Sequence, residues 1–159
     1  MTRPSWLDAI VGAELRDAHE VEVHFANEDP LTTGDLVLET DRGFFQILTA
    51  PDERRVRAMS SPADVRLVGD WSDRTGVVLK SKKAVDLSFR VARVDYVQRG
   101  DDVGGRRTIG AWLLGDASTV RMSILFERED AEIGPPTLLW SYLAEAAREE
   151  PRLTFFGKK

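Results

Sequence analysis

Apolar residues recur at alternate positions along most of this chain, a period that is typical of β-strands with one buried face. The clearest paired pattern covers residues 35–48, which read DLVLETDRGFFQIL. The first apolar run ends at Leu38, Asp41-Arg42-Gly43 interrupts the pattern, and a second apolar run begins at Phe44. The segment predicts a β-hairpin with a three-residue loop, closed by Gly43 in the left-handed conformation.

Other segments show the same two-residue period. Between residues 85 and 96 the alternation changes phase, which predicts a β-bulge near Ala92 and Arg93. Residues 119–126 form the clearest single strand pattern, with Ser123 on the outward face. A strand is also expected over residues 14–25, with four apolar side chains on one face: Leu15, Val21, Val23 and Phe25. Further strands are expected at residues 54–59 and 64–68, as a second hairpin, and at residues 77–80, 108–114 and 153–156.

Two segments show a helical pattern instead. Residues 6–11 follow Ser5, a suitable N-cap, and precede Gly12, a common helix stop, which predicts a short helix. Residues 136–149 repeat apolar side chains at i, i+1, i+4, i+5, i+8 and i+9, which predicts an amphipathic helix. Both helices are expected to pack on the sheet through their apolar faces.

These elements predict an α+β domain that is mostly β, with a short N-terminal helix and an amphipathic C-terminal helix. The strands would form a curved antiparallel sheet or a partly closed barrel of about eight strands. Residues 1–159 are expected to be a single domain. A weak internal β-repeat, covering about 13–50 and 84–127, is suggested by three matches at a constant offset of 71: Val23 with Val94, Phe25 with Tyr96, and Gly34 with Gly105.

The net charge of −5 hides an uneven distribution along the chain. Residues 1–52 contain 3 Lys or Arg and 11 Asp or Glu, whereas residues 53–99 contain 11 Lys or Arg and 6 Asp or Glu. One interpretation is that acidic strands lie beside basic strands in one sheet. The other is an acidic face that recruits a basic partner. Because the basic segment lacks interleaved aromatic residues, the pattern argues against nucleic-acid binding.

The composition also bears on where the protein acts. The sequence contains no cysteine, which favours a reducing, cytoplasmic setting. No apolar run approaches the roughly 20 residues that cross a bilayer, and the N-terminal residues do not resemble a signal peptide. We therefore expect a cytoplasmic protein that does not enter a membrane.

His19 and His24 are the first candidates for metal binding or acid–base chemistry. On a strand, residues five apart point to opposite faces, so these two side chains cannot converge on one ion. The sequence also has no phosphate-binding loop, calcium loop or serine-nucleophile motif. We therefore expect no metal, cofactor or catalytic residue, and an enzyme or ligand-binding protein with a carboxylate-lined pocket stays the alternative.

Protein binding has better support from the residues. Trp71 lies between Asp70 and Asp73 in a turn-rich loop, and a tryptophan with a charged rim is typical of an interface anchor, although Trp71 could equally close one end of the sheet. Carboxylates that end the predicted C-terminal helix oppose the helix dipole, which suggests an acidic docking surface. The candidate partner-binding residues are Asp70, Trp71, Asp73, Glu129, Asp130, Glu132, Glu145 and Glu149.

The functional prediction follows from this surface. In size, acidity and lack of a catalytic motif the chain resembles small bacterial binding proteins, including immunity proteins that neutralise secreted toxins. We therefore expect a non-catalytic protein-binding domain that docks a basic partner, most concretely an immunity-type inhibitor of a bacterial toxin. A structural or phage-type assembly protein that uses its edge strands is a further alternative. The oligomeric state is left open.

Overall fold

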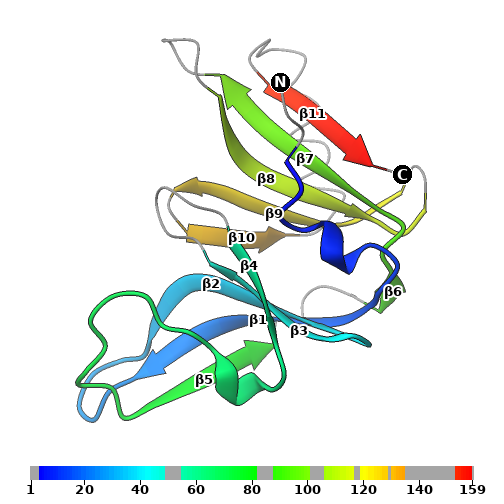
Figure 1. Cartoon of the computed structure of the whole chain (residues 1–159). Coiled ribbons are helices and arrows are strands. Elements are labelled where there is room, and N and C mark those ends of the chain that lie inside the picture. Colours follow the sequence, from blue (N-terminus) through cyan, green and yellow to red (C-terminus); the bar gives the residue numbers. More distant parts are fainter. Residues whose placement is uncertain are drawn as a thin grey trace.

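The computed structural model shows two antiparallel β-sheets that lie one above the other (Figure 1). It describes residues 4–48, 55–81, 88–100, 106–116, 119–128, 130–134 and 153–158. The first sheet has the strand order β4-β3-β2-β1-β5, with β6 also paired to β1; the second has the order β10-β9-β8-β7-β11. The strands of the first sheet are β1 (Glu14–His24), β2 (Leu31–Thr40), β3 (Gly43–Leu48), β4 (Arg55–Met59), β5 (Gly76–Ser81) and β6 (Phe89–Arg90). Those of the second are β7 (Arg93–Gly100), β8 (Arg106–Leu114), β9 (Val120–Arg128), β10 (Asp130–Gly134) and β11 (Leu153–Lys158).

The mostly β, antiparallel class is therefore confirmed, whereas the single curved sheet or partly closed barrel is not. Neither sheet closes among the described strands. The two sheets share one arrangement: four consecutive strands form a meander, and a fifth returns to pair with the first. The predicted sequence repeat between residues 13–50 and 84–127 stays a prediction, because a shared strand order does not require a duplicated sequence.

The predicted hairpin at residues 35–48 is confirmed as β2 and β3, but its loop has two residues instead of the predicted three, because Gly43 already belongs to β3. Leu38 pairs with Phe45 and Thr40 with Gly43, so Asp41 and Arg42 form the tip of the turn. Gly43 has a φ of +108°, the region in which a side chain would be strained. The Thr40 hydroxyl donates to the Gly43 carbonyl oxygen at 2.9 Å, which fixes the turn from inside.

The predicted β-bulge near Ala92 is instead the point where the chain changes sheets. β6 pairs with β1 in the first sheet, and β7 pairs with β8 in the second. Between them the Val91 N–H donates to the Ala13 carbonyl in the first sheet, and the Ala92 N–H donates to the Leu114 carbonyl in the second. The change of phase in the sequence was real, but it marks a strand that switches sheets rather than an extra residue in one strand.

The main hydrophobic core lies between the two sheets. The first sheet contributes mainly aliphatic side chains, and the second adds Tyr96 and Met122. Side chains from both sheets are fully buried there, including Ala18, Leu36, Leu38, Ile47, Val94, Leu113 and Ile124. Face-to-face packing of this kind explains the strict alternation in most strands. Ser123 points to the other face of the second sheet, as predicted, but it is fully buried there in a cross-strand row with Asp95 and Trp112.

The predicted N-terminal helix is only a single 3₁₀ turn at Asp8–Ile10. Its hydrogen bonds join residues three apart, and Ser5 makes no side-chain cap. Tertiary contacts explain the shorter element: the Tyr96 hydroxyl accepts from the Leu7 N–H at 2.8 Å and donates to an Asp8 carboxylate oxygen at 2.8 Å. Packing thus fixes this segment against the second sheet, with the Trp6 ring edge-on to Tyr96.

Three other predicted elements have different outcomes. Residues 55–59 form β4, but this strand pairs with β3. Residues 65–68 form no strand, so the prediction of a second hairpin over residues 54–68 was wrong. The strand at the C-terminal end is confirmed as β11, the edge of the second sheet. The predicted helix at 136–149 lies outside the described residues. Within the described part of the chain, no helix is long and apolar enough to span a membrane.

The Tyr96 hydroxyl should be a main support of the N-terminal segment. We expect Tyr96→Phe to lower the free energy of unfolding by about 1–3 kcal/mol, because the buried Leu7 N–H loses its acceptor. Urea denaturation would measure the change. Asp8→Asn is the matched control, since its amide oxygen can still accept from Tyr96, and an equal loss in both variants would contradict the role of the Leu7 contact.

Candidate functional site

The face of the first sheet that points away from the second sheet is covered by residues 60–75. Gln46 of β3 holds this covering segment with its side-chain amide. The amide oxygen accepts from the Arg66 N–H at 2.8 Å, and the amide nitrogen donates to the Arg66 carbonyl at 2.7 Å. The fully buried Gln46 side chain therefore replaces the backbone of a missing strand. This pairing explains why residues 65–68 are extended without joining the sheet.

A second, smaller hydrophobic cluster forms beneath the covering segment. Its buried members are Val21, Val37 and Met59, and the partly buried residues around it include Val65, Leu67, Val77 and Leu79. Leu15, by contrast, belongs to the core between the sheets. A register shift between Leu15 and Asp17 changes the phase of β1, so the predicted single apolar face of residues 14–25 is divided between two faces.

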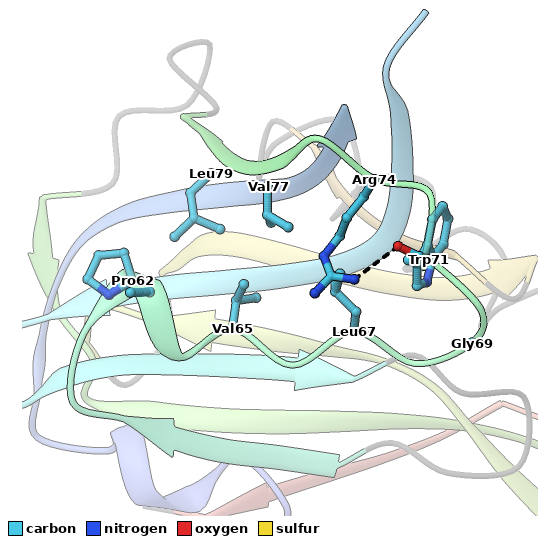
Figure 2. Close-up of a pocket in the computed structure, with 9 residues that line it drawn as sticks. Pro62, Val65, Leu67, Gly69, Trp71, Arg74, Val77 and Leu79 are labelled. Atoms are coloured by element: carbon cyan, nitrogen blue, oxygen red, sulfur yellow. Dashed lines mark hydrogen bonds between the residues drawn. The ribbon is translucent and has the colours of Figure 1, made fainter. Parts of the chain in front are cut away.

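A surface hollow of about 410 Å³ opens between the covering segment and β5 (Figure 2). Most of its lining residues are apolar, and it is called the apolar hollow below for that reason, although polar atoms form more of its open surface than apolar atoms do. Arg74 is the charged group among the described lining residues. The Arg74 guanidinium donates to the Trp71 carbonyl oxygen at 3.0 Å. The residues that line the hollow are Pro62, Ala63, Val65, Leu67, Gly69, Trp71, Arg74, Val77 and Leu79.

Trp71 both lines this hollow and stabilises its own loop. The side chain is half-buried; its indole N–H donates to the Val68 carbonyl at 2.8 Å, and its ring lies 6.2 Å from that of Phe25. Phe25 in turn lines a second hollow of about 270 Å³, together with Glu28 and Asp73. The Phe25–Trp71 pair therefore lies between an apolar hollow and one edged by carboxylates.

Two carboxyl groups of the covering segment, those of Asp70 and Asp64, have a lowered pKa. Asp70 is exposed, and hydrogen bonds from the Ser72 side chain and N–H lower its pKa below the usual value near 3.8. The pKa of Asp64, at the foot of the covering segment, is lowered by hydrogen bonds from the Ser60 hydroxyl and the Ser61 and Ser60 backbone. Asp64 and Ser61 form a capping box around the 3₁₀ turn Pro62–Asp64.

The uneven charge along the chain is partly explained inside the first sheet. On one side, acidic β1 pairs with β5 and β6, so that Glu20 is opposite Lys80 and Glu14 is opposite Arg90. Acidic β1 also lies beside acidic β2, however, and there Asp17 is directly opposite Glu39. Pairing of opposite charges therefore accounts for only one side of β1.

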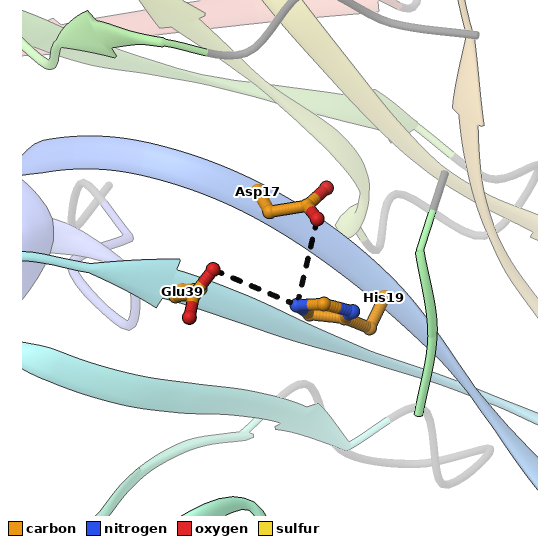
Figure 3. Close-up of side chains that lie close together, drawn as sticks. All are labelled: Asp17, His19 and Glu39. Carbon is orange, nitrogen blue, oxygen red and sulfur yellow. Dashed lines mark ion pairs between the residues drawn. The ribbon is translucent and has the colours of Figure 1, made fainter. Parts of the chain in front are cut away.

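His19 lies next to this acidic pair (Figure 3). Its Nε2 atom is 3.9 Å from an oxygen of Asp17 and 4.0 Å from an oxygen of Glu39. His24 points to the other face of β1 and lies 2.8 Å from Glu22, so the two histidines diverge as predicted. The Asp17–His19–Glu39 group, called the triad below, is a set of side chains in the described part of the chain that could hold a metal ion.

The structure brings together only part of the predicted partner-binding set. Asp70, Trp71 and Asp73 share one loop beside the two hollows. Asp130 and Glu132 belong to β10 in the second sheet. Glu129, Glu145 and Glu149 lie outside the described residues, so their grouping into one acidic surface stays a prediction.

Sequence reasoning missed both the apolar hollow and the triad. The period of residues 64–68 resembled a strand, so nothing in the pattern showed that Val65 and Leu67 line a hollow. No motif marked Arg74 either. The spacing of Asp17 and His19 does place both on one face of a strand, and it could have been noticed. Glu39, by contrast, joins them only through the register between β1 and β2.

Comparison of the chain with models of protein families, with curated proteins and with solved structures gives no match in any of the three. A function for this protein is therefore inferred from the geometry of these sites alone.

Gln46 should determine whether the covering segment stays in place. We expect Gln46→Ala to lower the free energy of unfolding by about 1–3 kcal/mol, because the Arg66 N–H and carbonyl lose their partners. Gln98→Ala is the matched control, since the Gln98 amide nitrogen makes a long 3.4 Å bond to Thr108. Urea denaturation compares the two, and equal losses would contradict a special role for Gln46.

The two lowered carboxyl pKa values should respond to different serines. Ser60→Ala should raise the pKa of Asp64 toward 3.8 and leave that of Asp70 unchanged, and Ser72→Ala should do the reverse. A pH titration of the carboxyl carbons by NMR measures both. Because each folded pKa lies below the unfolded value, the stabilisation is present above the unfolded pKa and is lost as the pH falls through the folded pKa. Wild-type pKa values at or above 3.8 would contradict the assignment.

Proposed function

We propose that this protein is a non-catalytic protein-binding domain that docks a basic, extended segment of a partner protein beside β5. The observation that carries the proposal is the Phe25–Trp71 pair, which separates an apolar hollow from a hollow edged by Glu28 and Asp73. A segment that alternates apolar and basic side chains would place one kind in each hollow.

The apolar hollow is large enough to hold a side chain of the partner. A volume of about 410 Å³ is sufficient for one or two large side chains. The half-buried Trp71 ring is already fixed by its bond to Val68, so little side-chain entropy would be lost when a partner packs against it. Tryptophan in such a position is a frequent hot spot of protein interfaces.

The carboxylates favour a basic partner over an acidic one. Asp70, Asp73 and Glu28 are exposed around the two hollows, and hydrogen bonds lower the pKa of Asp70 further below neutral pH. Arg74 is tied to the Trp71 carbonyl and offsets only part of this charge. Exposed acidic groups of this kind speed association with a basic segment more than they tighten binding.

The edge position of β5 favours an extended segment. β5 ends the strand order of the first sheet among the described strands, so one row of its backbone groups faces no neighbouring strand there. A partner could therefore add a strand beside β5 and hydrogen-bond to that row. Val78, which is 45% exposed on β5, would be covered by such a strand.

The most specific form of this proposal is an immunity-type inhibitor, acting in the cytoplasm, that blocks a basic surface of a bacterial toxin. The support is the acidic rim together with a cysteine-free composition. The assembly alternative would use the same β5 edge, but it would not need the carboxylates of the rim.

Binding can be tested with two synthetic peptides, acetyl-Lys-Leu-Lys-Leu-Lys-amide and its counterpart with glutamate in place of lysine. The basic peptide should shift the amide NMR signals of Phe25, Trp71 and Leu79, and added salt should weaken the effect. The acidic peptide should leave these signals unchanged. Equal binding of both peptides would contradict a docking site selective for basic segments.

A double variant tests the carboxylate edge directly. Glu28→Gln with Asp73→Asn should weaken binding of the basic peptide about 2- to 30-fold, because each exposed ion pair contributes roughly 0.2–1 kcal/mol. Glu14→Gln is the matched control, since Glu14 begins β1 at the end far from Phe25. An equal effect of the control would mean that net charge alone determines binding.

A further inference from the structure

We propose that the triad of Asp17, His19 and Glu39 is a binding site for a divalent transition-metal ion of the zinc type. The site lies on the same face of the first sheet as the apolar hollow, but it does not depend on the proposed peptide binding. The residues come from two neighbouring strands, with Asp17 and His19 on β1 and Glu39 on β2 (Figure 3).

The distances leave room for an atom between the three side chains. His19 Nε2 lies 3.9 Å from Asp17 and 4.0 Å from Glu39, and one ligand atom of each residue lies within 4.8 Å of the other two. These gaps are too long for hydrogen bonds. They are only slightly longer than the roughly 3.4 Å between two ligands of a tetrahedral zinc ion with bonds near 2.1 Å.

The strand register gives a second, independent reason for a cation. Asp17 and Glu39 are paired directly across β1 and β2, and like charges at directly opposite positions destabilise a sheet. A metal ion between them would convert this repulsion into attraction.

Among the described residues, the histidine has no other partner that would explain its position. Its side chain is only 15% exposed, and its buried Nδ1 atom has no hydrogen-bond partner in that part of the chain. Its Nε2 atom points at the two carboxylates at distances beyond hydrogen bonding. The ring nitrogen that could bind a metal ion therefore faces the space between the two carboxylates.

One ligand is also oriented by neighbouring groups, as ligands of metal sites usually are. Asp17 accepts one hydrogen bond from the Ala18 N–H at 2.8 Å and another from the Ser81 hydroxyl of β5 at 2.7 Å. These bonds fix the carboxylate that faces His19. The side chains of Asp17 and Glu39 are 29% and 38% exposed, so an ion can reach them from solvent.

The ligand types indicate which ion fits. An imidazole nitrogen favours zinc and similar ions over calcium or magnesium, which prefer oxygen ligands alone. Three protein ligands leave a fourth tetrahedral position for water or for a group of a bound partner. His19 pairs with Ser81, two positions along β5 from Leu79 in the wall of the apolar hollow, so the open position would lie near that hollow.

Zinc titration of the full chain at pH 7.5, with a competing chromophoric chelator, tests the site. We expect wild-type protein to bind one zinc ion per chain, and Glu39→Gln to weaken this affinity more than about 10-fold, since even loss of a supporting group costs about that much. His24→Ala is the matched control, because His24 also has a carboxylate partner but no second one among the described residues. The zinc affinity of His24→Ala should equal that of wild type.

Two further measurements keep the proposal falsifiable if a variant is poorly folded. In metal-free buffer, Glu39→Gln should raise the midpoint of thermal unfolding, because it removes the charge repulsion between Glu39 and Asp17. Added zinc should raise the unfolding midpoint of wild type only. Zinc should also shift the ring-nitrogen NMR signal of Nε2 in His19 and leave His24 unchanged.

Three results would overturn the site. The first is equal zinc affinity in wild type and Glu39→Gln, and the second is a zinc-induced shift at His24 instead of His19. The third is a lower unfolding midpoint of metal-free Glu39→Gln at pH 8, which would show that a charged His19 pairs with Glu39, as an ordinary ion pair would.

Discussion

The double hydrogen bond between the Gln46 amide and the Arg66 backbone is the constraint on which the outer face of the first sheet depends. A buried amide that both donates and accepts can satisfy the N–H and the carbonyl of one residue, so a single side chain takes the place of a neighbouring strand. The Asp35 carboxylate accepts a third bond from the same amide at 3.1 Å, and Arg57 adds a contact at 3.3 Å. Without this network the covering segment would expose the Val21–Val37–Met59 cluster, and the apolar hollow would lose one wall.

The first sheet is therefore buried on two sides, and each side has a different role. The side toward the second sheet carries the main core, where Tyr96 also anchors the N-terminal turn. The other side combines a small core with the groups that could bind something: the apolar hollow, the carboxylate-edged hollow and the triad. A stable inner face lets the outer face retain features that weaken a sheet, such as the opposed carboxylates of Asp17 and Glu39.

β1 shows how one strand can serve both sides. A register shift between Leu15 and Asp17 changes which residues of β1 face the core. Leu15 and Ala18 consequently pack between the sheets, whereas Val21 packs under the covering segment. The same shift places Asp17 and His19 on the outer face beside Glu39, so the bulge both divides the apolar residues and assembles the triad.

The sequence by itself determined the local elements whose pattern is set by neighbouring residues. The hairpin of β2 and β3, with Gly43 at a positive φ, follows from alternation and from the turn chemistry of one glycine. Only the tertiary structure decided which sheet each strand joins, because the two-residue period specifies a buried face but not its partner. It also reduced residues 6–11 to a 3₁₀ turn through the Tyr96 hydroxyl, and it placed Glu39 against His19 and Trp71 against Phe25. These contacts join residues far apart in sequence, and no local pattern encodes the register that brings them together.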